Sequence, residues 1–209
     1  MRADSYLGRL VAALARSTPA FQPAHEPREV TCAPGRLDAR TEVLTSSNWS
    51  VAAAAELARA RRSGLLLLDM DQLRSVNDRW GHRAGDDVLA EVGKTLRTES
   101  EPNDVVGRFG GDEFVILLPD ADLEQSMLVA ERLRARIAEL AVAVVGLHDE
   151  SVVVADRTVS IGVAGKPRHG TSVVALVLAA ENALHMAKSS GGNVVRAAGS
   201  GEDADAEEA

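Results

Sequence analysis

Two glycines followed by two acidic residues, Gly110-Gly111-Asp112-Glu113, separate two apolar segments of the sequence. Segments 105–109 and 114–118 have the length and composition of β-strands, and adjacent glycines permit a tight hairpin between them. Acidic residues are common at exposed hairpin tips, so the turn alone indicates only a hairpin. The strongly apolar flanking segments indicate more, namely a hairpin at the centre of a sheet with both acids at one end of it.

A second acidic pair, Asp69 and Asp71, follows the aliphatic run 65–68, which is typical of a buried central strand. If this strand neighbours the hairpin, Asp69 converges with Asp112 and Glu113. Three carboxylates cannot stay ionised together without a counter-charge. A hard divalent cation, Mg²⁺ or Mn²⁺, supplies that charge, and it keeps coordination positions for water and phosphate oxygens. The acidic residues therefore indicate metal-dependent phosphoryl or nucleotidyl transfer.

Hydrophobic periodicity and the positions of glycines indicate the elements that must hold these residues. Helices are expected at 51–62, 73–80, 87–98, 123–140 and 172–188. Strands are expected at 65–68, 105–109, 114–118, 152–154, 158–164 and 193–196. A loop around Gly81 and Gly85 is expected to separate the second helix from the third.

The chain divides into three zones. Residues 1–37 hold a short amphipathic helix and a proline-rich linker, residues 38–197 form the folded domain, and residues 198–209 form a disordered acidic tail. The N-terminal helix is a dimer contact, the remnant of an input module, or simply a frayed helix. No sensor is recognisable within 1–37, so an activating signal is expected from an upstream sensor or a partner protein.

The composition is that of an ordinary globular protein, with 45% hydrophobic and 26% charged residues. The net charge is −8, and residues 202–209 contribute five acids to it, so the folded part is only mildly acidic and nucleic acid is not an expected partner. No apolar run is long enough to span a bilayer, and no signal-peptide pattern opens the chain. The single cysteine, Cys32, fits a reducing compartment, so a cytoplasmic location is expected.

Four ordered blocks of the sequence resemble the GGDEF, or diguanylate cyclase, family. The blocks are 108–114 (RFGGDEF), 68–78 (LDMDQLRSVND), 81–86 (GHRAGD) and 160–163 (SIGV), followed by a matching closing helix at 180–188. The resemblance is collinear over 38–197. It implies an α/β, palm-like fold similar to nucleotidyl cyclase catalytic domains, with a central, mostly antiparallel sheet of about five strands flanked by helices.

The resemblance also implies a role for each matching residue. The implied metal ligands are Asp69, the main-chain carbonyl of Met70, Asp112 and Glu113. The implied catalytic residues are Asp112 and Glu113, with Glu113 activating the attacking 3′-hydroxyl. The implied readers of the guanine base are Asn77 and Asp86. The other implied substrate contacts are Leu73, Arg74, Gly110, Gly111 and Lys188.

The sequence departs from the family pattern mainly on the phosphate side. Arg74 replaces the family's lysine, which exchanges a point charge for a planar fork. Lys188 is retained, but Gly192 stands where the family's closing pattern has an arginine. The opening motif, DxLTGLxNR in the family, is reduced to Asp38 and Thr41.

The function implied by the resemblance is that of a Mg²⁺-dependent enzyme in bacterial second-messenger signalling. A diguanylate cyclase condenses two GTP molecules into cyclic di-GMP and two pyrophosphates, acting as a homodimer. The departures favour an alternative from another class, a degenerate domain that binds GTP or a partner protein without catalysis. A third hypothesis is a different palm-like nucleotidyl cyclase, or a cyclase that makes mixed dinucleotides. The intact acids and base-reading pair place catalysis first.

Overall fold

The computed structural model describes residues 35–199. The helix and linker predicted within 1–37 and the acidic tail predicted from 198 onward fall almost entirely outside the described residues, as does Cys32. The zone boundaries therefore stay predictions.

Six strands form the central sheet, in the order β1-β3-β4-β2-β7-β8. Their bounds are β1 Leu44–Thr45, β2 Ser63–Met70, β3 Val105–Gly110, β4 Glu113–Pro119, β7 Val159–Lys166 and β8 Val195–Ala197. The inner pairings β3–β4, β4–β2 and β2–β7 are antiparallel, whereas β1 and β8 pair in parallel with β3 and β7. The predicted mostly antiparallel sheet is confirmed. It has six strands rather than about five, because the two-residue strand β1 is too short to leave a hydrophobic pattern.

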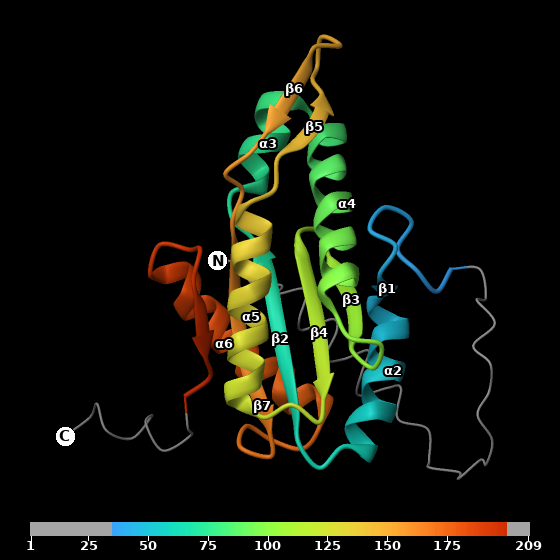
Figure 1. Cartoon of the computed structure of the whole chain (residues 1–209), viewed down its shortest axis with the longest axis vertical. Helices are drawn as coiled ribbons and strands as arrows, with labels where there is room; N and C mark the ends of the chain where they lie inside the picture. The colour runs from blue at the N-terminus through green and yellow to red at the C-terminus, as the bar shows by residue number, and fades with distance from the viewer. Residues whose placement is uncertain (1–34, 200–209) are drawn as a thin grey trace, which may run out of the picture. The chain divides into compact units, whose positions relative to one another are not determined.

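Helices cover both faces of this sheet (Figure 1). Those of the described segment are α2 Ser46–Arg59, α3 Leu73–Trp80, α4 His82–Glu99, α5 Leu123–Ala138 and α6 Val173–Ser189. α4 and α5 contact each other on one face, α2 and α6 contact each other on the other, and α3 packs against α4. In the stretch from 35 to 199, no helix combines the length and the apolar character needed to cross a bilayer.

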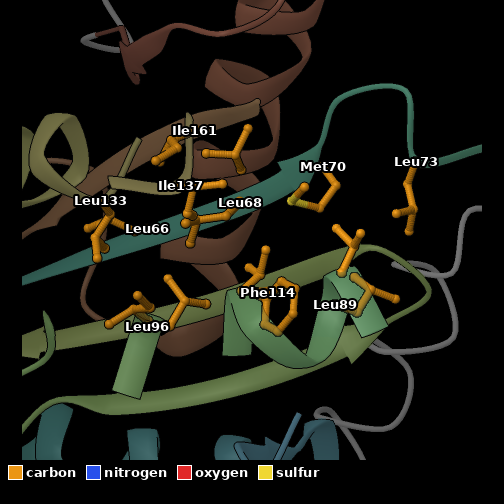
Figure 2. Packing of buried hydrophobic residues seen from close by; sticks show 14 of the residues in the cluster. Leu66, Leu68, Met70, Leu73, Leu89, Leu96, Phe114, Leu133, Ile137 and Ile161 are labelled. Atoms are coloured by element: carbon orange, nitrogen blue, oxygen red, sulfur yellow. The ribbon is translucent and has the colours of Figure 1, made fainter. Parts of the chain in front are cut away.

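Strand β2 is buried on both of its faces. Leu66 and Leu68 lie in the hydrophobic core with Phe114 of β4 and with residues of α4 and α5, as Figure 2 shows. On the opposite face α6 approaches the sheet so closely that a Cβ on Gly162 of β7 would lie 2.0 Å from the Ala180 carbonyl oxygen. Burial on both sides explains why residues 65–68 form a continuous aliphatic run. It also holds the last turn of α6 beside the end of β2.

Helix α4 begins at His82, so Gly85 lies inside the helix and not in the predicted loop. A Cβ at residue 85 would lie 1.9 Å from the Asn77 side-chain oxygen. This glycine therefore permits α3 and α4 to pack closely, a requirement that leaves no signal in local periodicity.

The predicted strand 152–154 belongs to a separate hairpin and not to the main sheet. β5 Val142–Val145 pairs antiparallel with β6 Ser151–Val154 and the hairpin projects beside α3 and α4 (Figure 1). β5 was not predicted, because its short run follows directly on the apolar end of α5. That helix ends at Ala138, two residues before its predicted end.

Candidate active site

The end of β2 and the turn between β3 and β4 lie side by side. Asp69 is in register with Glu113 across the two central strands, and the Met70 N–H donates to the Asp112 carbonyl at 3.2 Å. Gly111, at the tip of the turn, has a φ of +52°, a left-handed conformation that favours glycine. The structure thus brings together the three carboxylates expected to converge.

Arg108 fixes the shape of this turn. Its guanidinium donates to the Gly111 carbonyl at 2.6 Å and 3.2 Å, and to Asp38 Oδ1 at 2.9 Å. The Arg108 side chain is only 9% exposed, so this ion pair is shielded far better than an ordinary surface pair. Asp38 thereby joins the start of the domain to the acidic turn.

The ammonium group of Lys188, in the last turn of α6, reaches the same place. It donates to Asp69 Oδ1 at 2.5 Å and to the Met70 carbonyl at 3.3 Å, and it lies 3.0 Å from Asp71 Oδ1. Asp69 and the Met70 carbonyl are two of the oxygens that the sequence assigns to a metal. Lys188, predicted to contact the substrate, therefore lies on the metal side of the site.

Asp71, which the sequence pairs with Asp69 but to which it assigns no role, is also part of the site. Its carboxylate accepts hydrogen bonds from the hydroxyls of Thr158 and Ser160 and from the Asn193 N–H, each at 2.8 Å. Partial burial acts to raise its pKa, but these bonds and Lys188 outweigh burial and lower the pKa. Asp71 therefore stays ionised. It links β7 and the segment after α6 to the ammonium group of Lys188.

The surroundings of Glu113 favour its protonated form, and burial is the largest cause. Burial, followed by the charges of Asp69, Asp112 and Glu181, raises its pKa to about 7, against the opposing effect of Lys188. The pKa of Asp69 is also raised, first by burial and then by the neighbouring carboxylates, although Lys188 opposes the shift. A carboxyl group with a pKa near neutrality is suited to general-base chemistry.

The oxygen donors at this place fit a hard divalent cation. A cationic group already lies against the Asp69 carboxylate and the Met70 carbonyl, and the pKa of Glu113 is raised first by burial and then by the neighbouring carboxylates. Within residues 35–199, no three acidic, histidine or cysteine side chains are already grouped as a closed set of metal ligands. The donor chemistry suits the cation, and the Lys188 ammonium group lies against two of the expected donors.

The residues expected to read the base, Asn77 and Asp86, lie on the α3–α4 side of the domain. The Asn77 side chain packs over Gly85, next to Asp86 in the chain. Asp86 Oδ1 accepts a hydrogen bond from the Arg40 guanidinium at 2.6 Å. Arg40 was not predicted to contribute to the site, because 46 residues separate it from Asp86.

The phosphate-side residues are arranged less tightly. Leu73 is buried, with 5% exposure, so its side chain is not open to a substrate contact. Arg74 is 91% exposed and lies 3.6 Å from Asp78 on the same helix, outside the acidic cluster. Gly192 has a φ of +76°, and a Cβ there would lie 3.0 Å from a carboxylate oxygen of Asp71. An arginine at this position would have a strained backbone conformation, and its Cβ would lie in close contact with the Asp71 carboxylate.

Comparison with known proteins identifies the family of this arrangement. The family described as "Diguanylate cyclase, GGDEF domain" matches residues 36–194. Diguanylate cyclase DgcM of Escherichia coli is 38% identical over 142 residues, which is 68% of this chain and 32% of that protein. Diguanylate cyclase DosC of the same species is 31% identical over 166 residues, 76% of this chain and 34% of that protein. The chain thus spans about a third of the length of these curated relatives.

Solved structures give the same result. Diguanylate cyclase SiaD of Pseudomonas aeruginosa, in complex with its activator SiaC, is 32% identical with a TM-score of 0.68, covering 78% of this chain and 61% of that chain. The GGDEF domain of YfiN (or TpbB) from the same organism is 27% identical, also with a TM-score of 0.68, covering 76% of this chain and 98% of that chain. With its palm-like sheet and its acidic turn at the end of β2, this chain belongs to the diguanylate cyclase, or GGDEF domain, family.

Proposed function

We propose that this domain condenses two GTP molecules into cyclic di-GMP with a divalent metal ion, acting as a homodimer. The observation that carries the proposal is the convergence of Asp69, Asp112 and Glu113 at one sheet end, with Asn77 and Asp86 set apart on the α3–α4 side. A nucleoside triphosphate matches this division. Its anionic phosphates need a cation, which the acidic residues would hold, and its base offers hydrogen-bonding edges to the α3–α4 side.

The metal side binds and activates the substrate. Asp69, the Met70 carbonyl, Asp112 and Glu113 would hold the cation. When bound, the cation neutralises charge on the reacting phosphate and on the leaving pyrophosphate. Glu113 would accept the proton of the attacking 3′-hydroxyl. Burial and the neighbouring acids raise its pKa to about 7 in the metal-free protein, and a bound cation would lower that pKa.

The reaction joins two equivalent half-sites. Each 3′-oxygen forms a bond to the α-phosphorus of the opposite GTP, and the bond from that phosphorus to the β-phosphate bridge oxygen breaks. Two pyrophosphates leave, and the two hydroxyl protons pass through Glu113 of each subunit to solvent. A two-fold symmetric pair of chains suits this reaction, because one set of residues then serves both halves.

The second candidate is a domain that binds GTP, or a partner protein, without turning GTP over. Three observations favour it: Lys188 lies on Asp69, Arg74 lies outside the acidic cluster, and Gly192 offers no side chain to the phosphates. Against it, no carboxylate of the metal side is missing. A domain released from catalysis has little reason to retain three mutually repelling acids.

The deciding experiment is a GTP turnover assay across protein concentration, with Mg²⁺ or Mn²⁺ and product identification by mass. Cyclization between two chains predicts cyclic di-GMP and a rate per chain that rises with concentration. Adding ATP to the same assay tests the mixed-dinucleotide hypothesis directly. GTP binding without any cyclic product at the highest concentration would establish the non-catalytic candidate instead.

A further inference from the structure

Arg40 and Asp86 form a donor and acceptor pair on the base-reading side of the site. Arg40 lies in the loop before β1 and Asp86 in the second turn of α4, and Nη1 of Arg40 donates to Oδ1 of Asp86 at 2.6 Å. Asp86 is 31% exposed and Arg40 58% exposed, so both remain open to a ligand. Within residues 35–199, this is the one hydrogen bond of the Arg40 side chain. Its remaining N–H groups can therefore donate to a bound base.

The backbone around Arg40 is held firmly in place. Asp38 Oδ1 accepts from the Arg40 N–H at 3.3 Å, from the Thr41 N–H at 3.0 Å and from the Thr41 hydroxyl at 2.7 Å. The same oxygen is bound by Arg108, and Arg97 of α4 donates to the Thr41 carbonyl. Although the Arg40 side chain is exposed, it thus extends from a fixed point, which reduces the entropy lost when it makes a contact.

The chemistry of this pair matches guanine and opposes adenine. Guanine presents the O6 acceptor next to the N1–H and N2–H donors, whereas adenine presents a donor amine at N6 next to an acceptor at N1. A carboxylate accepts from the guanine donors, and a guanidinium beside it donates to O6. With adenine, the guanidinium would face the N6 amine, donor against donor.

We propose that Arg40 is a further base-reading residue, which donates to guanine O6 while Asp86 accepts from the N1–H and N2–H groups. This inference rests on the proposed GTP substrate and adds a specificity-determining residue to it. Arg40 would contact the acceptor of the guanine edge and Asp86 its donors, so Arg40 adds to the selection of guanine over adenine that Asp86 provides. Arg40 remains bound to Asp86 while it acts, because one carboxylate oxygen can accept two hydrogen bonds.

The test measures the dissociation constants of α,β-methylene GTP and α,β-methylene ATP, which cannot release pyrophosphate, for the full chain with Mg²⁺. Arg40→Leu is expected to weaken binding of the GTP analogue by about 3- to 10-fold, because one charged hydrogen bond to O6 is lost at a partly exposed site. Binding of the ATP analogue should stay the same or become tighter, because the unfavourable contact between the guanidinium and the N6 amine is removed. For Arg40→Lys, the dissociation constant of the GTP analogue is expected to lie between those of the wild type and Arg40→Leu, since lysine keeps the charge but lacks the planar guanidinium group.

Arg83→Leu is the matched control, because Arg83 is exposed in the first turn of α4 and carries the same charge. This variant is expected to change the dissociation constants of both analogues by the same factor. Two results overturn the proposal. If Arg40→Leu binds the GTP analogue more tightly than the wild type does, Arg40 blocks access to Asp86. If the ratio of the dissociation constants of the two analogues is unchanged, Arg40 and Asp86 form only a surface ion pair. Asp86→Asn separates this from the proposed function. If the wild type does not prefer the GTP analogue and Asp86→Asn has no effect, the GTP assignment itself fails.

Discussion

The Lys188 ammonium and the Asp69 carboxylate lie 2.5 Å apart, although 119 residues separate them in the chain. The contact brings the last turn of α6 to the end of β2 and places a positive charge on an oxygen that the proposed function assigns to a metal. Partial burial acts to lower the pKa of Lys188, but Asp69 and Asp71 outweigh it and raise the pKa, so the lysine is charged throughout the neutral range. Lys188 and a divalent ion therefore compete for Asp69.

Lys188→Met should raise the affinity of the nucleotide-free protein for Mn²⁺ and lower its affinity for a non-reactive GTP analogue. Removing the competing ammonium is expected to change the Mn²⁺ dissociation constant by about 3- to 10-fold, as for a partly exposed charged contact. Electron paramagnetic resonance of free Mn²⁺ measures the first effect and calorimetry the second. Arg74→Met is the control for the Mn²⁺ measurement, because it removes an exposed charge that lies outside the acidic cluster. Equal Mn²⁺ affinities in Lys188→Met and the wild type would contradict competition.

Glu113→Gln should lower GTP turnover by about 10²- to 10⁴-fold, the usual contribution of a positioned acid or base. Glutamine keeps the size of the side chain but neither accepts the 3′-hydroxyl proton nor carries charge to a metal. Glu91→Gln, which changes an acid paired with Lys94 on the surface of α4, should leave turnover unchanged. Initial rates at saturating GTP and metal provide the comparison, and a loss below tenfold would remove Glu113 from the proton-transfer step.

The stability of the metal-free protein should depend on pH through Glu113. Its pKa is about 7 in the folded state against 4.5 for a free side chain. Between these values the folded state keeps a proton that the unfolded state has lost, so the free energy of unfolding falls as pH rises through this window. The stabilising effect of the protonated carboxyl is complete below pH 4.5 and absent above pH 7.

Glu113→Gln tests this dependence by urea unfolding in a chelator. Relative to the wild type, the variant should gain on the order of 2 kcal/mol between about pH 4.5 and pH 7, since it avoids ionisation in the acidic cluster. The gain should shrink when Mg²⁺ is added, because a bound cation offsets the repulsion. A difference between variant and wild type that is constant with pH would show that Glu113 titrates normally.

Asp71→Asn should destabilise the fold by about 1–3 kcal/mol, because asparagine leaves some of the donors around it without an acceptor. The donors are the hydroxyls of Thr158 and Ser160 and the Asn193 N–H, which lie on two separate segments of the chain. Asp78→Asn is the matched control: Asp78 faces exposed Arg74, and its loss should cost no more than about 0.5 kcal/mol. Equal midpoints in urea for the two variants would show that Asp71 does not hold these segments together.

Local pattern was sufficient to predict the strand ends that carry Asp69 and Glu113. An aliphatic run buried on both faces and a glycine hairpin are encoded by neighbouring residues, so periodicity detects them. The partners of Lys188, Asp71 and Arg40 lie far along the chain, and only tertiary packing selects them. Gly85 illustrates the limit in another way, because a glycine needed for helix contact looks the same in sequence as a glycine in a loop.

The hydrogen bonds of Asp38 connect the loop before β1 to the site. Through Arg108, this carboxylate reaches the Gly111 carbonyl on the acidic turn, and two residues further on Arg40 reaches Asp86 on the base side. A displacement of residues 38–40 would therefore change contacts in both halves of the site at the same time. Asp38 and Thr41, the two residues that remain of the opening motif, therefore lie on the segment that links the acidic turn to the base side of the site.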